Sequence, residues 1–355
     1  TVVLVVGDFD DSVAEAAIRK HFAAWQPAPP PPRPTAGPVD ISRAGLTDIH
    51  LDPALSERVT VTRLSPWQEQ QDIVANRRQN LLRSIGYGIV NRRLLAQARM
   101  ADPPFRGAGF GTGDIFEEAR TTNLVVDSAD GEWAKGLSSA AETLRRALDF
   151  GFTEAEVAEQ VAGALTAQEN AAAAADTRTN ADLMGTALAL VSDDQIPSTP
   201  ASGLERLRAF IPYITPAAVL EALRRDATPL HNPLIRFRGR TMPEGGVNAL
   251  RAAWDTASAG SVEPLAEAAQ APFGYTDFGV PGTVVADTEE PRLGIRQVRF
   301  DNGVMLNLKR TELQQDRIAF EINLDGGTLL NTADNPLATA LVTYLPVGGL
   351  GKHSQ

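Results

Sequence analysis

The chain has 355 residues, 43% of them hydrophobic, and a formal charge of −11 at pH 7, which is enough sequence for about two compact domains. The acidic balance argues against a nucleic-acid-binding surface, since such surfaces are usually basic, and no run of about 18 apolar residues is present that would span a membrane. The sequence contains no cysteine, which excludes disulfides, thiolate metal sites and a cysteine nucleophile.

The first 26 residues combine an apolar run with an amphipathic helix. The run Thr1–Val6 (TVVLVV) predicts a strand buried on both faces. After a turn at residues 7–11, apolar side chains recur at helical spacing, and Asp11 or Ser12 is a suitable N-cap. The apolar positions are Val13, Ala17, Ile18, Phe22 and Trp25. One strand and one helix cannot bury a core, so we expect the rest of this domain, with any targeting signal, to precede Thr1.

A proline-rich stretch then precedes a long region of mixed secondary structure. Residues 27–38 contain seven prolines, which favours an extended spacer, with an SH3-type ligand as the alternative. Beyond it, the patterns predict strands at 59–64, 105–117, 120–127 and 234–238, and helices at 68–100, 132–149, from 153 onward, 179–191, 203–211 and 216–226, with a last helix ending near 254. This segregated order is typical of an α+β domain and differs from the regular alternation of a doubly wound sheet.

Three local features of this region carry more specific expectations. Thr153-x-x-Glu156 predicts a capping box. The basic pairs at 77–78 and 92–93 fall in a helical pattern beside acids, which predicts a solvated helix face. Four glycines alternate at 107, 109, 111 and 113 without the spacing of a dinucleotide site. They favour a kinked or bulged strand or an exposed loop, and a contact between this backbone and a bound peptide is the alternative.

The C-terminal part predicts a second linker and the beginning of another unit. Residues 256–294 are rich in alanine, glycine, proline and acids. Asn302-Gly303 then stands between two alternating apolar segments and predicts a hairpin with a type I′ turn. Residues 318–324 alternate as a further strand, Gly326-Gly327 ends it, and a helix is expected at about 335–345.

Taken in chain order, these patterns resemble the pitrilysin/insulinase family of zinc metallopeptidases. A domain of that family typically ends with an apolar strand, a Gly-Asp-x-Asp turn and a helix finishing in Phe-x-x-Trp, as do Val2–Val6, Gly7–Asp10 and Phe22–Trp25. A half of such an enzyme typically begins with an Asn-Gly hairpin, an alternating strand ending in Gly-Gly and a helix, as in residues 300–345. One domain's length of α+β sequence separates the two patterns.

The resemblance implies a domain plan and a fold. Residues 1–26 would end a first domain, 27–46 would form a proline-rich linker, 47–255 a second, non-catalytic domain, 256–294 another linker, and 295–355 the start of a third, inactive domain. The implied fold is the α+β pitrilysin/mitochondrial-processing-peptidase-like domain, an antiparallel sheet with helices packed on one face. The layout is similar to that of bacterial single-chain enzymes of four domains, so the chain is expected to be an internal fragment.

The family's chemistry requires His-x-x-Glu-His on a helix, with zinc bound by the two histidines. The resemblance places the first histidine position on Thr339, the glutamate on Val342 and the second histidine on Thr343, and none of these side chains supports that chemistry. The chain's histidines are far apart and none has a partner four residues on: His21, His50, His231 and His353. We therefore expect no catalytic, metal or cofactor residue in this chain, with zinc in an upstream domain.

The function implied by the resemblance is the non-catalytic inner region of a zinc-dependent metalloendopeptidase, in which 47–255 forms part of the substrate-enclosing chamber. The expected partners are the remaining domains and peptide substrate, without nucleic acid or membrane. A catalytically inactive protein that binds peptides or assembles with a subunit is the alternative, and a scaffold without a ligand is a third. The resemblance favours the periplasm, the cytoplasm stays open, and the sequence does not indicate which residues bind substrate.

Overall fold

The computed structural model describes residues 2–26, 29, 36–265, 274–313 and 318–340. The chain divides into two compact units, the first formed by 1–172 with 178–266 and the second by 173–177 with 267–355. None of the helices in the described residues has the length and apolar character that crossing a bilayer requires.

The N-terminal segment contains helix α1, Asp11–Phe22. Its N-cap is Asp10, whose carboxylate accepts hydrogen bonds from the backbone N–H groups of Ser12 (2.8 Å) and Val13 (3.3 Å), so the expectation of Asp11 or Ser12 at this position is wrong by one or two residues. The predicted strand at 1–6 is also wrong for residues 2–6, which form no strand and leave Val2 61% exposed. A strand buried on both faces requires neighbouring strands to pair with, and none in the described part of the chain pairs with these residues.

The first unit is built on a five-stranded sheet with the order β1-β5-β2-β4-β3. All four predicted strands of this unit are confirmed, and β1 is one that the sequence pattern did not predict. Their bounds are β1 Thr47–Leu51, β2 Arg58–Pro66, β3 Gly107–Ile115, β4 Ala119–Asp127 and β5 Leu234–Gly239. The sheet is antiparallel except that β1 runs parallel to β5. Strand β3 is therefore an edge strand, paired on one side only.

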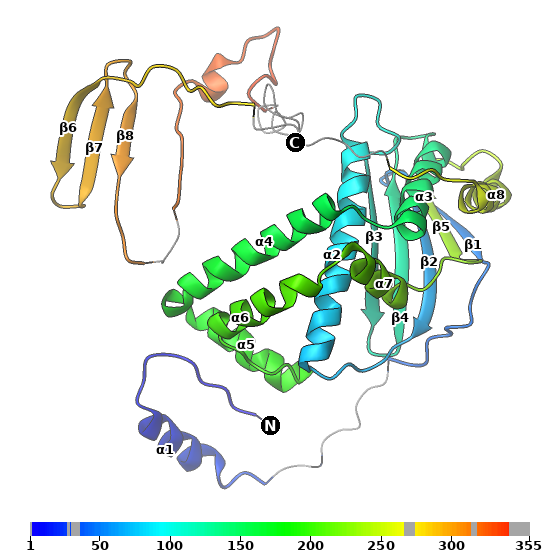
Figure 1. Ribbon diagram of the computed structural model, residues 1–355, viewed down its shortest axis with the longest axis horizontal. Helices are drawn as coiled ribbons and strands as arrows, with labels where there is room; N and C mark the ends of the chain where they lie inside the picture. Colours follow the sequence, from blue (N-terminus) through cyan, green and yellow to red (C-terminus); the bar gives the residue numbers. More distant parts are fainter. Residues whose placement is uncertain (1, 27–28, 30–35, 266–273, 314–317, 341–355) are drawn as a thin grey trace. The chain divides into compact units, whose positions relative to one another are not determined.

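Besides α1, the described residues of the first unit contain seven α-helices (Figure 1). They are α2 Val74–Ala98, α3 Trp133–Phe150, α4 Glu154–Ala173, α5 Asn180–Asp193, α6 Pro200–Phe210, α7 Pro216–Asp226 and α8 Gly246–Ala259. The predicted capping box is present before α4, since Glu156 N–H donates to Thr153 Oγ1 (3.2 Å) and Thr153 N–H donates to Glu156 Oε2 (2.9 Å). Helix α2 begins six residues later than the sequence predicts, so Ile73 precedes it in extended conformation and is 49% exposed.

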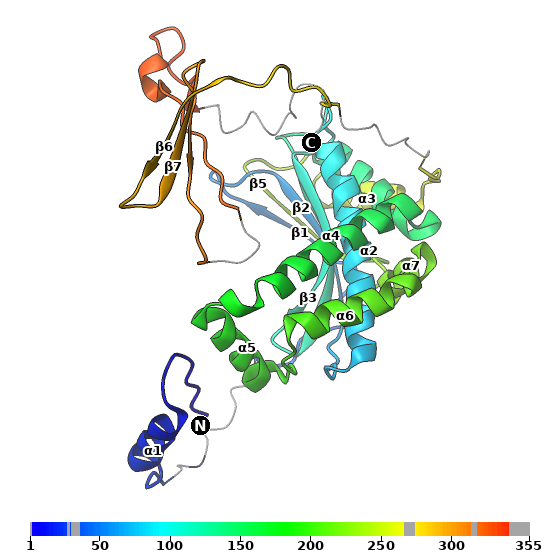
Figure 2. The ribbon, with the colours of Figure 1, turned by 60° about the vertical axis from the view of Figure 1, so that its left-hand side comes forward.

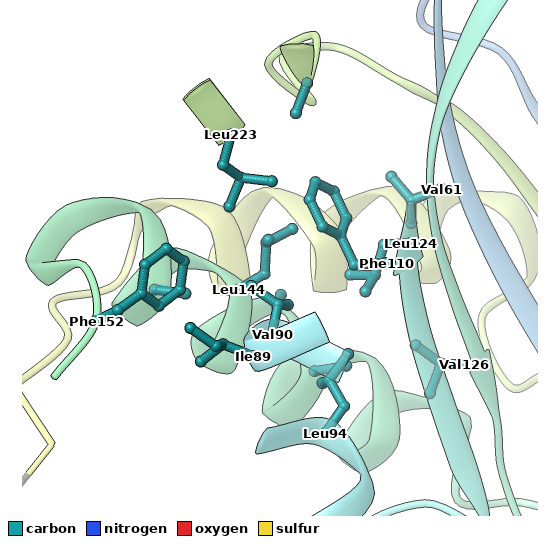
Figure 3. Packing of buried hydrophobic residues seen from close by; sticks show 14 of the residues in the cluster. Val61, Ile89, Val90, Leu94, Phe110, Leu124, Val126, Leu144, Phe152 and Leu223 are labelled. Carbon is teal, nitrogen blue, oxygen red and sulfur yellow. The ribbon is translucent and has the colours of Figure 1, made fainter. Parts of the chain in front are cut away.

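The core lies between the helices and one face of the sheet, which confirms the predicted fold class. Figure 2 shows α2, α3 and α7 on one side of the strands. Alternate residues of β2 and β4 point into this layer, where Val61 and Leu124 are fully buried. Figure 3 shows these side chains pointing into the same layer as Val90 of α2 and Leu144 of α3, which belong to the same cluster. Because side chains alternate along a strand, the intervening residues occupy the opposite face.

The second unit contains a three-stranded antiparallel sheet in the order β6-β7-β8. Its strands are β6 Val284–Glu290, β7 Ile295–Phe300 and β8 Met305–Leu308. Strand β6 lies inside the stretch 256–294, which was expected to be a linker, and α8 ends at Ala259, beyond the expected boundary at residue 255. The division into domains and linkers stays a prediction.

The predicted hairpin joins β7 and β8, but its turn differs from the expectation. A type I′ turn requires positive φ at both central residues, whereas only Gly303 (φ 87°) is positive here. Gly303 N–H donates to Phe300 C=O (3.0 Å) and Phe300 N–H donates to Val304 C=O (2.9 Å). This pattern is a three-residue loop with glycine in the left-handed position, so the glycine still sets the turn while Asn302 keeps negative φ.

Two further expectations for this unit are wrong or fall outside the described residues. Residues 318–324 form no strand, and Ile318 is 92% exposed. An alternating pattern yields a strand only where a partner strand and a covering layer exist, and nothing in the described part pairs with this segment. Of the helix expected at 335–345, residues 336–339 form a turn instead, while 341–345 lie outside the described residues.

Candidate functional site

The face of the five-stranded sheet opposite the core, called here the open face, is polar. Each strand contributes alternate residues to it through the pairing register. The polar ones are Asp48 and His50 of β1, Arg236 and Arg238 of β5, Arg58, Thr60 and Thr62 of β2, and Thr121, Asn123 and Asp127 of β4, and the apolar Leu64, Val125 and Leu234 share the face. A shallow depression of about 680 Å³ lies over the central strands β5 and β2. The face therefore offers hydroxyls, amides and guanidinium groups.

The charges of the open face are mixed, with a positive excess. Arg58 and Asp127 form a bidentate ion pair across β2 and β4, and this hydrogen bonding raises the pKa of Arg58. Arg236 Nε lies 3.1 Å from Asp48 Oδ2. Arg238 has no carboxylate partner among the described residues, so three arginines face two aspartates on this surface of an acidic chain.

The edge of the open face is formed by the four glycines of β3, Gly107, Gly109, Gly111 and Gly113, called here the glycine strip. Strand β3 pairs with β4 in unbroken register from Gly107 opposite Asp127 to Ile115 opposite Ala119. The expectation of a kink, a bulge or a loop at the four glycines is therefore wrong. All four lie on the open face, and a Cβ atom added at Gly107 or Gly111 would meet no atom within 4 Å. A chain passing over β3 could approach its backbone closely at these positions.

The outer edge of β3 is occupied at its centre by a side chain of α2. Asn91 Nδ2 donates to the C=O of Phe110 (2.9 Å), and the N–H of Phe110 donates to Asn91 Oδ1 (2.8 Å). The carboxamide thus pairs with both backbone groups of Phe110 as another strand would. Exposed strand edges promote association with other chains, so Asn91 shields this position.

An ion network fixes β3 and β4 to α2 and α7. Asp226, at the end of α7, accepts hydrogen bonds from Arg83 (2.7 Å), Tyr87 (2.8 Å) and Arg120 (2.9 Å). Burial favours the neutral acid, but the hydrogen bond from Tyr87 and the charges of Arg83 and Arg120 outweigh it, so the pKa of Asp226 lies below its ordinary value. Burial raises the pKa of Tyr87, which stays a neutral donor. The network holds the glycine strip at a fixed distance from the helix layer.

Of the three expected zinc-motif positions, Thr339 is the one within the described residues. Thr339 lies in the C-terminal turn, where its N–H donates to Asn331 Oδ1 (3.2 Å), and Val342 and Thr343 lie outside the described residues. A threonine hydroxyl in place of an imidazole does not fit the ligand set of a catalytic zinc ion. Within the described ranges, no group of three or more histidines and acids is placed to hold a metal ion.

The histidines lie in separate surroundings. His21 is in α1 and His231 is exposed in the loop before β5, while His353 lies outside the described residues. His50 lies on the open face beside Arg236 and Arg238, where two positive charges disfavour a bound cation. The expectation that the chain holds no catalytic or metal-binding residue stays a prediction.

Sequence reasoning missed several polar side chains that shape the first unit. Asn91 and Asp226 act over sequence separations of 19 and up to 143 residues, so no local pattern marks them. The basic pair at 92–93 was expected to be solvated, yet Arg93 pairs with Glu156 (2.7 Å) and is only 11% exposed. The alternate spacing of the glycines was a usable signal, because residues at i and i+2 of a strand share one face.

Comparisons with known proteins agree with this fold. The sequence model of a family described as the peptidase M16 inactive domain matches residues 1–163. The chain is similar in structure to the periplasmic protease PqqL from Escherichia coli, with 12% identity and a TM-score of 0.62 over 86% of this chain and 34% of that one. It is also similar to a mutant of the ferredoxin protease FusC solved with Arabidopsis ferredoxin, with 15% identity and a TM-score of 0.58 over 85% and 34%.

A predicted insulinase family protease from Yersinia pestis is similar as well, with 16% identity and a TM-score of 0.55 over 71% of this chain and 54% of that one. At these identities the likeness concerns the fold. Among curated proteins, none matches the sequence. The chain spans about a third of the length of the first two structures and about half of the third.

Proposed function

We propose that this chain, whose residues 1–163 match the model of the peptidase M16 inactive domain, is a member of the M16, or pitrilysin/insulinase, family and forms a non-catalytic wall of a zinc-dependent metalloendopeptidase. In this proposal the open face holds an extended peptide while a separate domain of the whole protein carries the zinc and the chemistry. The remaining domains and the peptide substrate are its partners. The observation that carries the proposal is the glycine strip at the edge of a polar, accessible sheet face.

The chemistry of the open face suits unfolded peptide of varied sequence. Glycine positions let a second backbone come close without a side-chain clash. The threonines and Asn123 around the strip offer hydrogen bonds to peptide amides, and Arg238 offers a charge to peptide carboxylates. Apolar residues also line the depression, namely Leu46, Val125, Leu234 and Ile235, so apolar side chains of the peptide could be held there beside its hydrogen-bonded backbone.

Peptide binding by the intact chain tests this proposal. Gly111→Val fills open space on β3 with a residue that strands favour, so the fold should be retained or stabilised. An unstructured, fluorescein-labelled peptide should bind Gly111→Val about tenfold more weakly, a loss of about 1.4 kcal/mol. Gly163→Ala, on α4 and also with open space around its Cβ, is the matched control and should bind like the wild type. Equal affinity of all three chains would refute the proposal.

A catalytically inactive protein of the same fold, which binds peptides or assembles with a subunit, is the alternative. The fold and the open face are the same under both proposals, so the neighbouring coding sequence discriminates between them. A His-x-x-Glu-His motif encoded upstream of Thr1 supports the peptidase, because two histidines one helical turn apart bind zinc and the glutamate serves as general base. Its absence from the whole protein supports the inactive alternative.

The proposal also includes a periplasmic location, which rests on the fold shared with PqqL, described as a periplasmic protease. Cell fractionation of the whole protein tests it. Recovery with cytoplasmic markers would contradict it.

A further inference from the structure

A second cavity of the first unit lies among its helices, away from the open face. It is a cleft of about 590 Å³ between α2, α4 and α6, helices that Figure 1 shows next to one another in the lower part of this unit. Four arginines line it, Arg77, Arg78, Arg178 and Arg206, and no aspartate or glutamate does. The chain as a whole is acidic, with 44 acidic and 33 basic residues, whereas the charged residues that line this cleft are all basic.

Two of these guanidinium groups form no direct ion pair among the described residues, although the charge of Arg206 also helps to lower the pKa of nearby Asp72. Arg206 donates to the hydroxyls of Ser202 (2.7 Å) and Ser198 (2.9 Å). The guanidinium of Arg78 lies 5.0 Å from the ring centroid of Phe210. Serine hydroxyls and an aromatic face orient a guanidinium without forming an ion pair with it. Both arginines are therefore positioned to accept an anionic group.

Arg77 differs from these two because its charge is already balanced. It forms an ion pair with Asp72, and this hydrogen bonding holds the pKa of Asp72 at about 2. The backbone N–H of Ile196 donates to the same carboxylate (2.7 Å), and the C=O of Ile196 accepts from Arg77 (2.6 Å). This cluster ties the loop before α6 to α2 and so fixes one wall of the cleft.

The floor of the cleft is apolar. Its apolar lining residues include Leu207 and Phe210 of α6, Ala164 and Ala167 of α4, and Leu81 of α2. Helix α6 also begins at the cleft, with Thr199 as its N-cap, and the positive end of a helix dipole adds to the attraction for anions. An occupant that satisfies both the arginines and the floor has a negative group beside an apolar one.

We propose that this cleft binds an acidic, partly apolar peptide segment of another chain. An aspartate or glutamate side chain of the segment pairs with Arg78 and Arg206, and a neighbouring apolar side chain covers Leu207 and Phe210. The volume lies within the range of about 300–1,000 Å³ typical of ligand pockets, and charge complementarity identifies the occupant. The inference concerns a site separate from the open face and does not depend on the function proposed for that face.

Binding of two labelled peptides to the intact chain tests the inference. One alternates glutamate with leucine and the other alternates glutamine with leucine. Fluorescence anisotropy should show that the acidic peptide binds, that its affinity falls with added salt because the attraction is screened, and that the glutamine peptide binds at least about tenfold more weakly. Equal binding of the two peptides would overturn the proposal.

Variants locate the site. Arg206→Gln and Arg78→Gln should each weaken binding of the acidic peptide about tenfold, while Arg240→Gln, which removes an exposed arginine 3.5 Å from Asp130, should leave it unchanged. Gly111→Val should also leave it unchanged, which separates this site from the open face. Near-ultraviolet circular dichroism checks that each variant is folded. Unchanged binding of the acidic peptide by both cleft variants would overturn the proposal. It would also be overturned if inorganic phosphate displaced the acidic peptide and a peptide of alternating glutamate and serine bound as tightly as the one of glutamate and leucine.

Discussion

Replacing Asp226 by asparagine tests whether the buried ion network stabilises the first unit. The carboxylate side chain is 10% exposed, and its partners Arg83 and Arg120 are 24% and 21% exposed. The variant keeps the shape and one acceptor oxygen but removes the charge. Arg83 then has no carboxylate among the described residues, whereas Arg120 keeps Asp114 at 2.9 Å.

The expected loss follows from these contacts. Hydrogen bonds to charged groups contribute about 1.5–3 kcal/mol each, and breaking a buried ion pair costs about 3–5 kcal/mol. Because the introduced carboxamide would still accept from Tyr87 and the arginines retain some contact with water, we expect a loss of about 3 kcal/mol in the free energy of unfolding. Asp114→Asn removes the other partner of Arg120, but Asp114 is 48% exposed, so its loss should stay below about 1 kcal/mol.

Urea unfolding followed by near-ultraviolet circular dichroism measures both variants, since Trp133 and Trp254 are buried in the first unit. The contribution of Asp226 has a defined pH dependence. Its folded-state pKa is lowered, so the stabilisation is present above the unfolded-state pKa and is lost as the pH falls through the folded-state pKa. Equal losses for Asp226→Asn and Asp114→Asn, or a difference that does not shrink in acid, would refute the reasoning.

Three further predictions concern single features. Asn91→Ala removes the hydrogen bonds between Asn91 and both backbone groups of Phe110, so we expect a loss of about 1–2 kcal/mol in the free energy of unfolding and increased self-association in sedimentation velocity. Asn76→Ala is the control on the same helix, because the Asn76 side chain bonds only to the C=O of Gln71, and it should leave the association state unchanged. Two variants that sediment alike would contradict the role given to Asn91. Burial raises the pKa of Glu57, so ionisation of Glu57 destabilises the folded chain above the unfolded-state pKa. As the pH rises from about 4 to about 7, Glu57→Gln should therefore become more stable relative to the wild type. A difference in unfolding free energy that is independent of pH would rule this out. The purified chain should contain no stoichiometric zinc, and one zinc per chain by atomic emission would overturn that expectation.

The order of elements in the first unit could be predicted because its signals are local. Apolar periodicity placed α3, α7 and β4 within one or two residues, and the capping box at Thr153 marked the start of α4. The strands predicted at 1–6 and 318–324 show the limit of such signals. Their residues have the right pattern, but a strand is stabilised by pairing, and no described strand pairs with them.

The candidate sites depended on longer-range geometry. Gly107 and Gly111 could be recognised as unusual from the sequence, yet their place on an accessible edge follows only from the pairing of β3 with β4. Arg78 was expected on a solvated helix face. It lines a cleft together with Arg206 because α6, more than 100 residues later in the chain, lies beside α2. A helical pattern shows which residues share a face but not what packs opposite that face.

The proposed role of the open face depends on contact between peptide and the glycine strip of β3. Hydrogen–deuterium exchange of the intact chain, with and without a saturating unstructured peptide, measures protection along residues 107–115. We expect slower exchange in this segment when peptide is bound, with little change in α8, which packs on the other face of the sheet. Peptide binding that leaves the exchange of 107–115 unchanged would contradict the proposed role.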